Sequence, residues 1–137
     1  MSIRVARPAD HDAIVGLWQR CGLSRPWIDA RAELDLKVAT DPDGMLVAGP
    51  VAGEVWGTVM AGFDGHRGWV NYLAVEPDRR RGGIAAALMA AAEAHLGSLG
   101  APKVNLQVRT SNLDVLAFYA TLGYVDDDVV SLGKRLP

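Results

Sequence analysis

Apolar and polar positions along the 137-residue chain follow two periods, one typical of strands and the other of helices. Alternation over a short run predicts a half-buried strand, whereas apolar residues three or four apart predict one face of a helix. The segments predicted as strands are 3–7, 45–48, 54–62, 69–75, 103–108, 124–125 and 129–133. The segments predicted as helices are 8–20, 28–39, 83–99 and 113–123. Interleaved strands and helices indicate the α/β (α+β) class.

The pattern changes most sharply between residues 70 and 94. A run rich in β-formers stops at Glu76 and Pro77, three arginines and two glycines follow, and then come almost pure helix formers. Free backbone N–H groups and the positive end of the helix dipole make such a helix start a binding site for anions. We therefore expect this basic glycine turn to hold a pyrophosphate group. The strand at 103–108 returns after a short link, which implies a right-handed parallel crossover.

Composition limits the classes of protein to which the chain can belong. Half of its residues are hydrophobic and 22% are charged, which suits one compact domain over residues 1–137. No apolar run reaches the ~18 residues of a membrane span, and the first residues lack the apolar core of a signal peptide, so we expect a cytoplasmic protein with no membrane partner. The net charge of −2 argues against a nucleic-acid partner, which makes the local cluster of three arginines more informative.

The sequence lacks the residue patterns of disulfides, metal sites and nucleotide-binding motifs. Cys21 is the single cysteine, which excludes an intrachain disulfide. Its place on the apolar stripe of the first helix predicts a core thiol without a cationic neighbour. No spacing of His, Cys, Asp and Glu predicts a metal site, and neither a Walker sequence nor Gly-x-Gly-x-x-Gly occurs. We expect no metal, and the usual evidence for nucleotide hydrolysis or a Rossmann site is lacking.

Two motifs in the second half of the chain carry a family resemblance. The sequence Arg80-Arg81-Gly82-Gly83-Ile84-Ala85 resembles the Arg/Gln-x-x-Gly-x-Gly/Ala signature of the GNAT superfamily of acyl-CoA-dependent N-acetyltransferases. Asn112 and the later Tyr119-x-x-x-Gly123-Tyr124 resemble the downstream motif of that family, and the order of elements matches from Ile3 to Leu136. One departure is Gly82, where the family often has Lys or Arg. Three stretches, 25–27, 64–68 and 131–136, are similar to small bacterial acetyltransferases of the YpeA type.

The resemblance implies a fold and a coenzyme site. The implied fold is a mixed, mostly antiparallel sheet of six to seven strands flanked by about four helices, with the parallel crossover at the coenzyme. Acetyl-CoA is the implied co-substrate, its pyrophosphate held by the amides of residues 81–85 and its pantetheine arm lying where the strands 69–75 and 103–108 splay apart. The implied coenzyme-binding residues are Leu73, Ala74, Val75, Arg80, Arg81, Gly82, Gly83, Ile84, Ala85, Asn112 and Phe118. Asn112 has a second interpretation, as the cap of its own helix.

The resemblance also points to groups that move protons. Tyr119 is the candidate general acid, because a phenol held close can protonate the departing thiolate of coenzyme A. The alternative is a packing tyrosine at a helix end. Glu76, Asp64 and His66 are candidate general bases for the attacking amine, and Glu76 is the one we assign to catalysis. The alternative to a side-chain base is a relay of water molecules. The alternative role for Glu76 is that of a solvated residue in a turn.

These assignments predict an N-acetyltransferase in which a primary amine attacks acetyl-CoA directly within a ternary complex. The loops carrying Arg25, Trp27, Asp64 and His66 are expected to bind the acceptor, which is a small molecule or a peptide. A homodimer is compatible with the resemblance. Because no general base stands out, a non-catalytic acyl-CoA-binding or regulatory module of the same fold is the alternative function.

Overall fold

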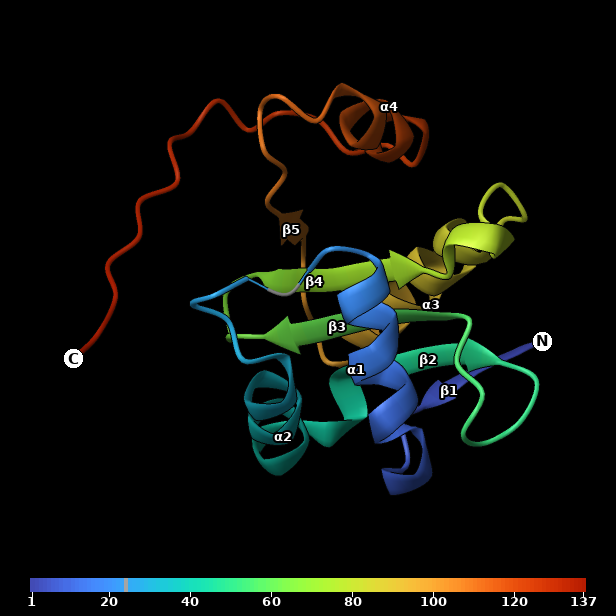
Figure 1. Cartoon of the computed structure of the whole chain (residues 1–137). Helices are drawn as coiled ribbons and strands as arrows, with labels where there is room; N and C mark the ends of the chain where they lie inside the picture. The colour runs from blue at the N-terminus through green and yellow to red at the C-terminus, as the bar shows by residue number, and fades with distance from the viewer. Residues whose placement is uncertain (24) are drawn as a thin grey trace. The chain divides into compact units, whose positions relative to one another are not determined.

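The computed structural model describes residues 1–23 and 25–137. They form two compact units, residues 1–106 and residues 107–137. The first unit contains a sheet with the strand order β1-β2-β3-β4-β5 (Figure 1). Its strands are β1 (Ser2–Val5), β2 (Met45–Gly49), β3 (Gly57–Phe63), β4 (Gly68–Val75) and β5 (Val104–Leu106). The first three pairings are antiparallel and β4 pairs with β5 in parallel, which confirms the predicted mixed, mostly antiparallel sheet and the crossover.

The described residues contain four α-helices, the number that the sequence predicted. They are α1 (His11–Arg20), α2 (Ala30–Thr40) and α3 (Ile84–Ser98) in the first unit, and α4 (Leu113–Thr121) in the second. Short 3-10 turns lie at η1 (Pro8–Asp10), η2 (Pro42–Gly44) and η3 (Pro77–Arg79). In the part of the chain that the structure describes, none of these helices has the length and apolar character that a bilayer crossing requires.

The predicted number of strands was wrong. The sheet has five strands rather than six to seven, and the segments 124–125 and 129–133 form no strand. Their apolar residues are strongly exposed, with Val125 and Leu132 exposed by 82% and 91%. Alternating apolar residues make a strand only where the backbone finds a neighbouring strand to bond, and that pairing is not a property of the segment itself.

Two helices cover one face of the sheet and a third covers the other (Figure 1). On the first face, α1 and α2 bury a cluster of side chains against β2 and β4. The fully buried members of this cluster are Ile14, Leu17, Trp18, Leu34, Met45 and Val47. The apolar stripe predicted for the first helix is therefore the one that packs on the sheet.

The alanine-rich helix α3 lies on the opposite face, close to the strands. A Cβ added at Gly57 would come within 2.8 Å of Leu88 and 3.1 Å of Ile84, and one added at Gly68 within 2.9 Å of Leu96. Small residues on both partners permit this close approach, and buried Leu88 and Leu96 fill the space between them. The packing fixes the start of α3 beside the end of β4.

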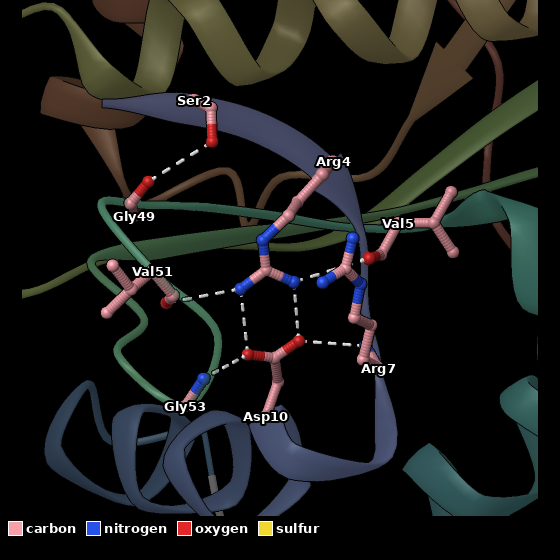
Figure 2. A network of polar contacts seen from close by, with 8 residues as sticks. All are labelled: Ser2, Arg4, Val5, Arg7, Asp10, Gly49, Val51 and Gly53. Atoms are coloured by element: carbon pink, nitrogen blue, oxygen red, sulfur yellow. Dashed lines mark hydrogen bonds and ion pairs between the residues drawn. The ribbon is translucent and has the colours of Figure 1, made fainter.

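A buried ion pair ties the first strand to the turn before α1 (Figure 2). The Asp10 carboxylate is fully buried and accepts hydrogen bonds from Arg4 at 2.6 and 2.9 Å. It also accepts from the backbone amides of Arg7 and Gly53, at 2.8 and 2.7 Å. The Arg4 guanidinium holds the pKa of Asp10 far below its usual range. All four contacts satisfy a buried charge that would otherwise be costly.

Candidate active site

The basic glycine turn joins the end of β4 to the start of α3. After the single turn η3, Arg80 is extended, Arg81 has φ +69°, and Gly83 has φ +82° immediately before Ile84 begins the helix. The left-handed φ at Gly83 is one that residues with a Cβ rarely adopt, and a Cβ there would meet no atom within 4 Å. Backbone conformation, and not lack of space, therefore favours glycine at this position.

The first turn of α3 presents unpaired backbone donors. No side chain caps the helix at Gly83, and the first turn contains no acidic residue. The first amides of a helix have no intrahelical acceptors, and the helix dipole adds positive potential there. The turn thus combines free N–H groups with the exposed guanidinium of Arg81, which is the arrangement that binds phosphate groups.

The other two arginines of the turn hold it in place. Arg80 Nε donates a hydrogen bond of 3.3 Å to the carbonyl oxygen of Val75, so its side chain folds back to the end of β4. Arg79 stacks its guanidinium over the ring of Trp56, 3.7 Å from the centroid. Such a cation–π contact stabilises an exposed pair by roughly 0.5–1 kcal/mol. Arg81 differs from both because no contact of this kind holds it in the described residues.

The C-terminal half of β4 has a free edge on the side of β5. The parallel pairing joins only Gly68, Val70 and the residue between them to β5, while β4 continues to Val75. Among the described residues, none continues the ladder on that side beyond Val70. Unpaired strand backbone offers donors and acceptors to an extended ligand. The gap lies just before the glycine turn, where the family resemblance implies that the two strands splay apart.

A β-bulge interrupts β4 in this same half. Thr58 pairs with Ala74 whereas Met60 pairs with Asn71, so β4 has one residue more than β3 between these pairs. Tyr72 lies in the bulge with φ +52°. The Thr58 hydroxyl donates to the Tyr72 carbonyl oxygen at 2.9 Å and accepts from Trp18 Nε1 at 2.9 Å. Bulges of this kind occur beside active sites, where they redirect side chains and break the ladder.

The second unit contains the other predicted motif. Asn112 caps α4, its side-chain oxygen accepting from the Val115 amide at 3.4 Å, in agreement with its interpretation as the cap of its own helix. Tyr119 is only 9% exposed and packs between Phe118 and Tyr124, with ring centroids 5.2 and 5.6 Å away. Burial raises the pKa of Tyr119 to about 12. The phenol is therefore held in its protonated form.

Comparison with known proteins decides the family. The sequence profile of the Acetyltransferase (GNAT) family matches residues 11–124. The chain belongs to the GNAT acetyltransferase family. It is 49% identical to an acetyltransferase of Sodalis glossinidius and 47% identical to one of Pectobacterium atrosepticum, covering 99% of this chain and 96% of each relative. This GNAT protein is thus an acyltransferase enzyme, while the narrower YpeA type stays a prediction.

A solved structure shows the same GNAT fold at lower identity. Naa20 of Chaetomium thermophilum, crystallised with a bisubstrate analogue, is 26% identical and has a TM-score of 0.69. The alignment covers 89% of this chain and 70% of that protein. The likeness supports the α/β architecture of the GNAT chain.

The predicted base of this GNAT enzyme is held by a partner that the sequence analysis did not foresee. Glu76 accepts two hydrogen bonds from Arg20, from Nε at 2.9 Å and from Nη2 at 2.6 Å. The Arg20 guanidinium lowers the pKa of Glu76 below its ordinary value. A carboxylate so paired accepts a proton less readily, and its catalytic role stays a prediction. The pair also links the end of α1 to the glycine turn.

The expectation that Cys21 has no cationic neighbour was wrong. Arg80 Nη2 lies 3.6 Å from the Cys21 sulfur, and the thiol donates to the Val75 carbonyl oxygen at 3.5 Å. The thiol is partly buried, at the edge of the α1 cluster. Residues 59 apart in sequence meet here, and no local signal in the chain predicts that contact.

The predicted acceptor residues have varied structural roles in this GNAT fold. Asp64 accepts from the backbone amides of His66 and Arg67, each at 2.7 Å, and from Trp69 Nε1 at 3.2 Å, so it closes the turn between β3 and β4. The two backbone amides lower the pKa of Asp64, that of Arg67 most. His66 lies in this turn, beside the Arg67 side chain. Their role with an acceptor stays a prediction.

The loop between α1 and α2 carries the other two predicted acceptor residues. Arg25 donates to the Gly22 carbonyl oxygen, and a bridge between Arg25 and Ile28 makes a tight turn. Trp27 lies in this turn with 58% of its surface exposed. Such exposure is unusual for tryptophan and suits a contact surface. Within residues 1–23 and 25–137, no cluster of three His, Cys, Asp or Glu residues could hold a metal ion.

Proposed function

We propose that the enzyme transfers an acetyl group from acetyl-CoA to a primary amine by direct attack within a ternary complex. The observation that carries the proposal is the uncapped start of α3, which follows the basic glycine turn at the end of β4. Membership of the GNAT family supports an acyl-CoA donor. The bisubstrate analogue bound by Naa20 of Chaetomium thermophilum supports two substrates held side by side.

Residues of the first unit fit the coenzyme. The amides of residues 81–85 would hold the pyrophosphate, and Arg81 would add charge. Arg80 would act mainly by keeping the turn closed through its hydrogen bond to Val75. The free backbone edge at residues 73–75 would hold the pantetheine arm as a neighbouring strand does, because β5 leaves that edge unpaired. When bound, acetyl-CoA supplies an activated acyl carbon as a thioester.

The reaction needs three proton movements. The acceptor ammonium first loses a proton, and the amine nitrogen then forms a bond to the acyl carbon and gives up a second proton as the bond from that carbon to sulfur breaks. The departing thiolate takes up one proton, so that one proton is released overall. We assign the donation to Tyr119, which burial keeps protonated. We favour water over Glu76 for the first proton, because Arg20 already neutralises that carboxylate.

Two measurements test the proposal. Calorimetry should detect acetyl-CoA binding to the wild-type protein in the absence of any amine. A thiol-release assay with acetyl-CoA should then give turnover above background with at least one of spermidine, lysine amide, kanamycin and short peptides. No binding of acetyl-CoA would overturn the coenzyme site. Binding without turnover across the panel would overturn transfer to amines of these classes.

A further inference from the structure

An unusual pair of side chains lies next to the proposed acyl site. The Tyr72 hydroxyl, from the bulge of β4, donates a hydrogen bond to Oε2 of Glu33 in the first turn of α2. The two residues are 39 positions apart in sequence. Glu33 is exposed and Tyr72 is half-buried, so the pair lies at the surface of the first unit.

The backbone at Tyr72 is strained, and its surroundings keep it so. A left-handed φ in a bulky residue costs about 1–3 kcal/mol and persists only where neighbouring contacts impose it. Trp18 stacks on the Tyr72 ring, with centroids 4.1 Å apart and an interplanar angle of 21°. Thr58 holds the Tyr72 carbonyl oxygen. These contacts fix the phenol beside Glu33, an arrangement that core packing alone does not require.

The pair has the acceptors that an ammonium group needs. The Tyr72 hydroxyl donates to Oε2 of Glu33. Oε1 of Glu33 and the lone pairs of the phenol oxygen therefore remain as acceptors for a ligand. An ammonium carries three N–H donors and a positive charge, so it can bond both oxygens at once. In the described ranges 1–23 and 25–137, no arginine, lysine or histidine forms an ion pair with Glu33. Its negative charge is therefore available to a ligand.

The position of the pair matches the reaction. Tyr72 immediately precedes Leu73, the first of the three residues whose backbone would hold the pantetheine arm, and strand residues are about 3.3 Å apart. We propose that Glu33 and Tyr72 bind the ammonium group of the acceptor, so that the enzyme acts on cationic primary amines. This inference rests on the proposed function and names two acceptor-binding residues that the sequence analysis missed.

The variants Glu33→Gln and Tyr72→Phe test the inference. Glu33→Gln removes a negative charge and Tyr72→Phe removes a hydroxyl. Neither changes the side-chain volume much, so we expect the fold to be retained. The control is Asp35→Asn, which removes the same charge from an exposed site on α2 that faces another direction. Binding of spermidine to each protein saturated with coenzyme A is measured by calorimetry, and KM and kcat are measured for lysine amide and for glutamate.

We expect Glu33→Gln to weaken spermidine binding and to raise the KM for lysine amide by about tenfold, as loss of one charge-assisted hydrogen bond implies. Tyr72→Phe should have a smaller effect in the same direction, while Asp35→Asn should match the wild type. Acetyl-CoA affinity should be unchanged in all three.

Wild-type values in both Glu33→Gln and Tyr72→Phe, or a higher kcat/KM for glutamate than for lysine amide, would overturn the inference while leaving the proposed function intact. A wild type that binds no acetyl-CoA would instead remove the proposed function and the inference with it.

Discussion

At the scale of single residues, the chemistry depends on whether a buried phenol can serve as an acid. Tyr119→Phe keeps the ring contacts with Phe118 and Tyr124 and removes only the hydroxyl. Loss of a general acid lowers the rate by roughly 10²–10⁴. We expect kcat to fall by about this factor, with acetyl-CoA affinity measured by calorimetry unchanged. An unaltered kcat would leave Tyr119 as a packing residue.

The pH dependence of kcat gives a second test of the same residue. Because burial raises the pKa of Tyr119 to about 12, the proton that it donates is present at every pH below that value. We therefore expect no fall in kcat from loss of the acid between pH 8 and pH 10 at saturating substrates. A descending limb near pH 10 that disappears in Tyr119→Phe would show a phenol with an ordinary pKa.

Residue types were easier to predict from the sequence than their pairings. Glu76 could be placed just after a strand, but its partner Arg20 is 56 residues away on α1. The Arg80–Cys21 contact spans 59 residues. Side chains separated in this way meet only because α1 packs across the end of β4, and local pattern does not encode that packing. The order of strand, glycine turn and helix was predictable because all the residues involved are consecutive.

At the scale of elements, the turn before α3 depends on the left-handed conformation of Gly83. Alanine there must adopt a φ near +82° at a cost of roughly 1–2 kcal/mol, or the turn must change shape. We expect Gly83→Ala to lower the free energy of unfolding by about this amount and to weaken acetyl-CoA binding by more than tenfold. Chemical denaturation and calorimetry measure the two effects.

Gly97 provides the matched control for that substitution. It lies within α3, is exposed, and a Cβ there would meet no atom within 4 Å. Replacing glycine by alanine inside a helix stabilises it by roughly 0.5–1 kcal/mol. Gly97→Ala should therefore raise the free energy of unfolding and leave acetyl-CoA affinity unchanged. Equal effects of the two substitutions would refute the special role of the turn.

The bulge of β4 depends on a single buried hydroxyl. Thr58→Val keeps the shape of the side chain but leaves Trp18 Nε1 and the Tyr72 carbonyl without their partner. An unsatisfied buried donor costs roughly 1–3 kcal/mol. We expect the free energy of unfolding to fall by this amount. We also expect kcat/KM to fall, whereas Asp35→Asn leaves it at the wild-type value. A stability equal to wild type would show that the bulge does not need this bond.

Elements with their own boundary signals were predicted well. Apolar periodicity placed the four helices, although less regularly in 28–39, and glycines marked the ends of the other three. The apolar runs placed the five strands of the sheet with ends shifted by a few residues. The bulge was missed because Trp18 and Thr58 impose it from other elements, and the residue with positive φ, Tyr72, is neither glycine nor asparagine. The strands at 124–125 and 129–133 were wrong for a related reason, since pairing requires a partner that the segment does not specify.

At the scale of the first unit, one buried charge links three separate parts of the chain. Asp10 joins β1 through Arg4, the turn before α1 through Arg7, and the loop after β2 through Gly53 (Figure 2). Loss of one member of a buried ion pair costs roughly 3–5 kcal/mol, because the other charge stays buried. Asp10→Asn should therefore lower the free energy of unfolding by several kcal/mol at pH 7, as measured by chemical denaturation. The control Asp12→Asn breaks the exposed pair with Arg31 and should cost at most about 1 kcal/mol.

The sign of the pH effect follows from the direction of the shift. The pKa of Asp10 is lowered in the folded state, chiefly by its hydrogen bonds with Arg4, from about 3.9 in the unfolded chain. Such a carboxylate contributes its full stabilisation above the unfolded value and loses it as the pH falls toward the folded value. The stability difference between wild type and Asp10→Asn should therefore be constant from pH 7 to about pH 5 and shrink below about pH 4. A difference that stays constant down to pH 3 would mean that the ionised carboxylate stabilises the folded state no more than the protonated carboxyl does, and that folding does not lower the pKa of Asp10.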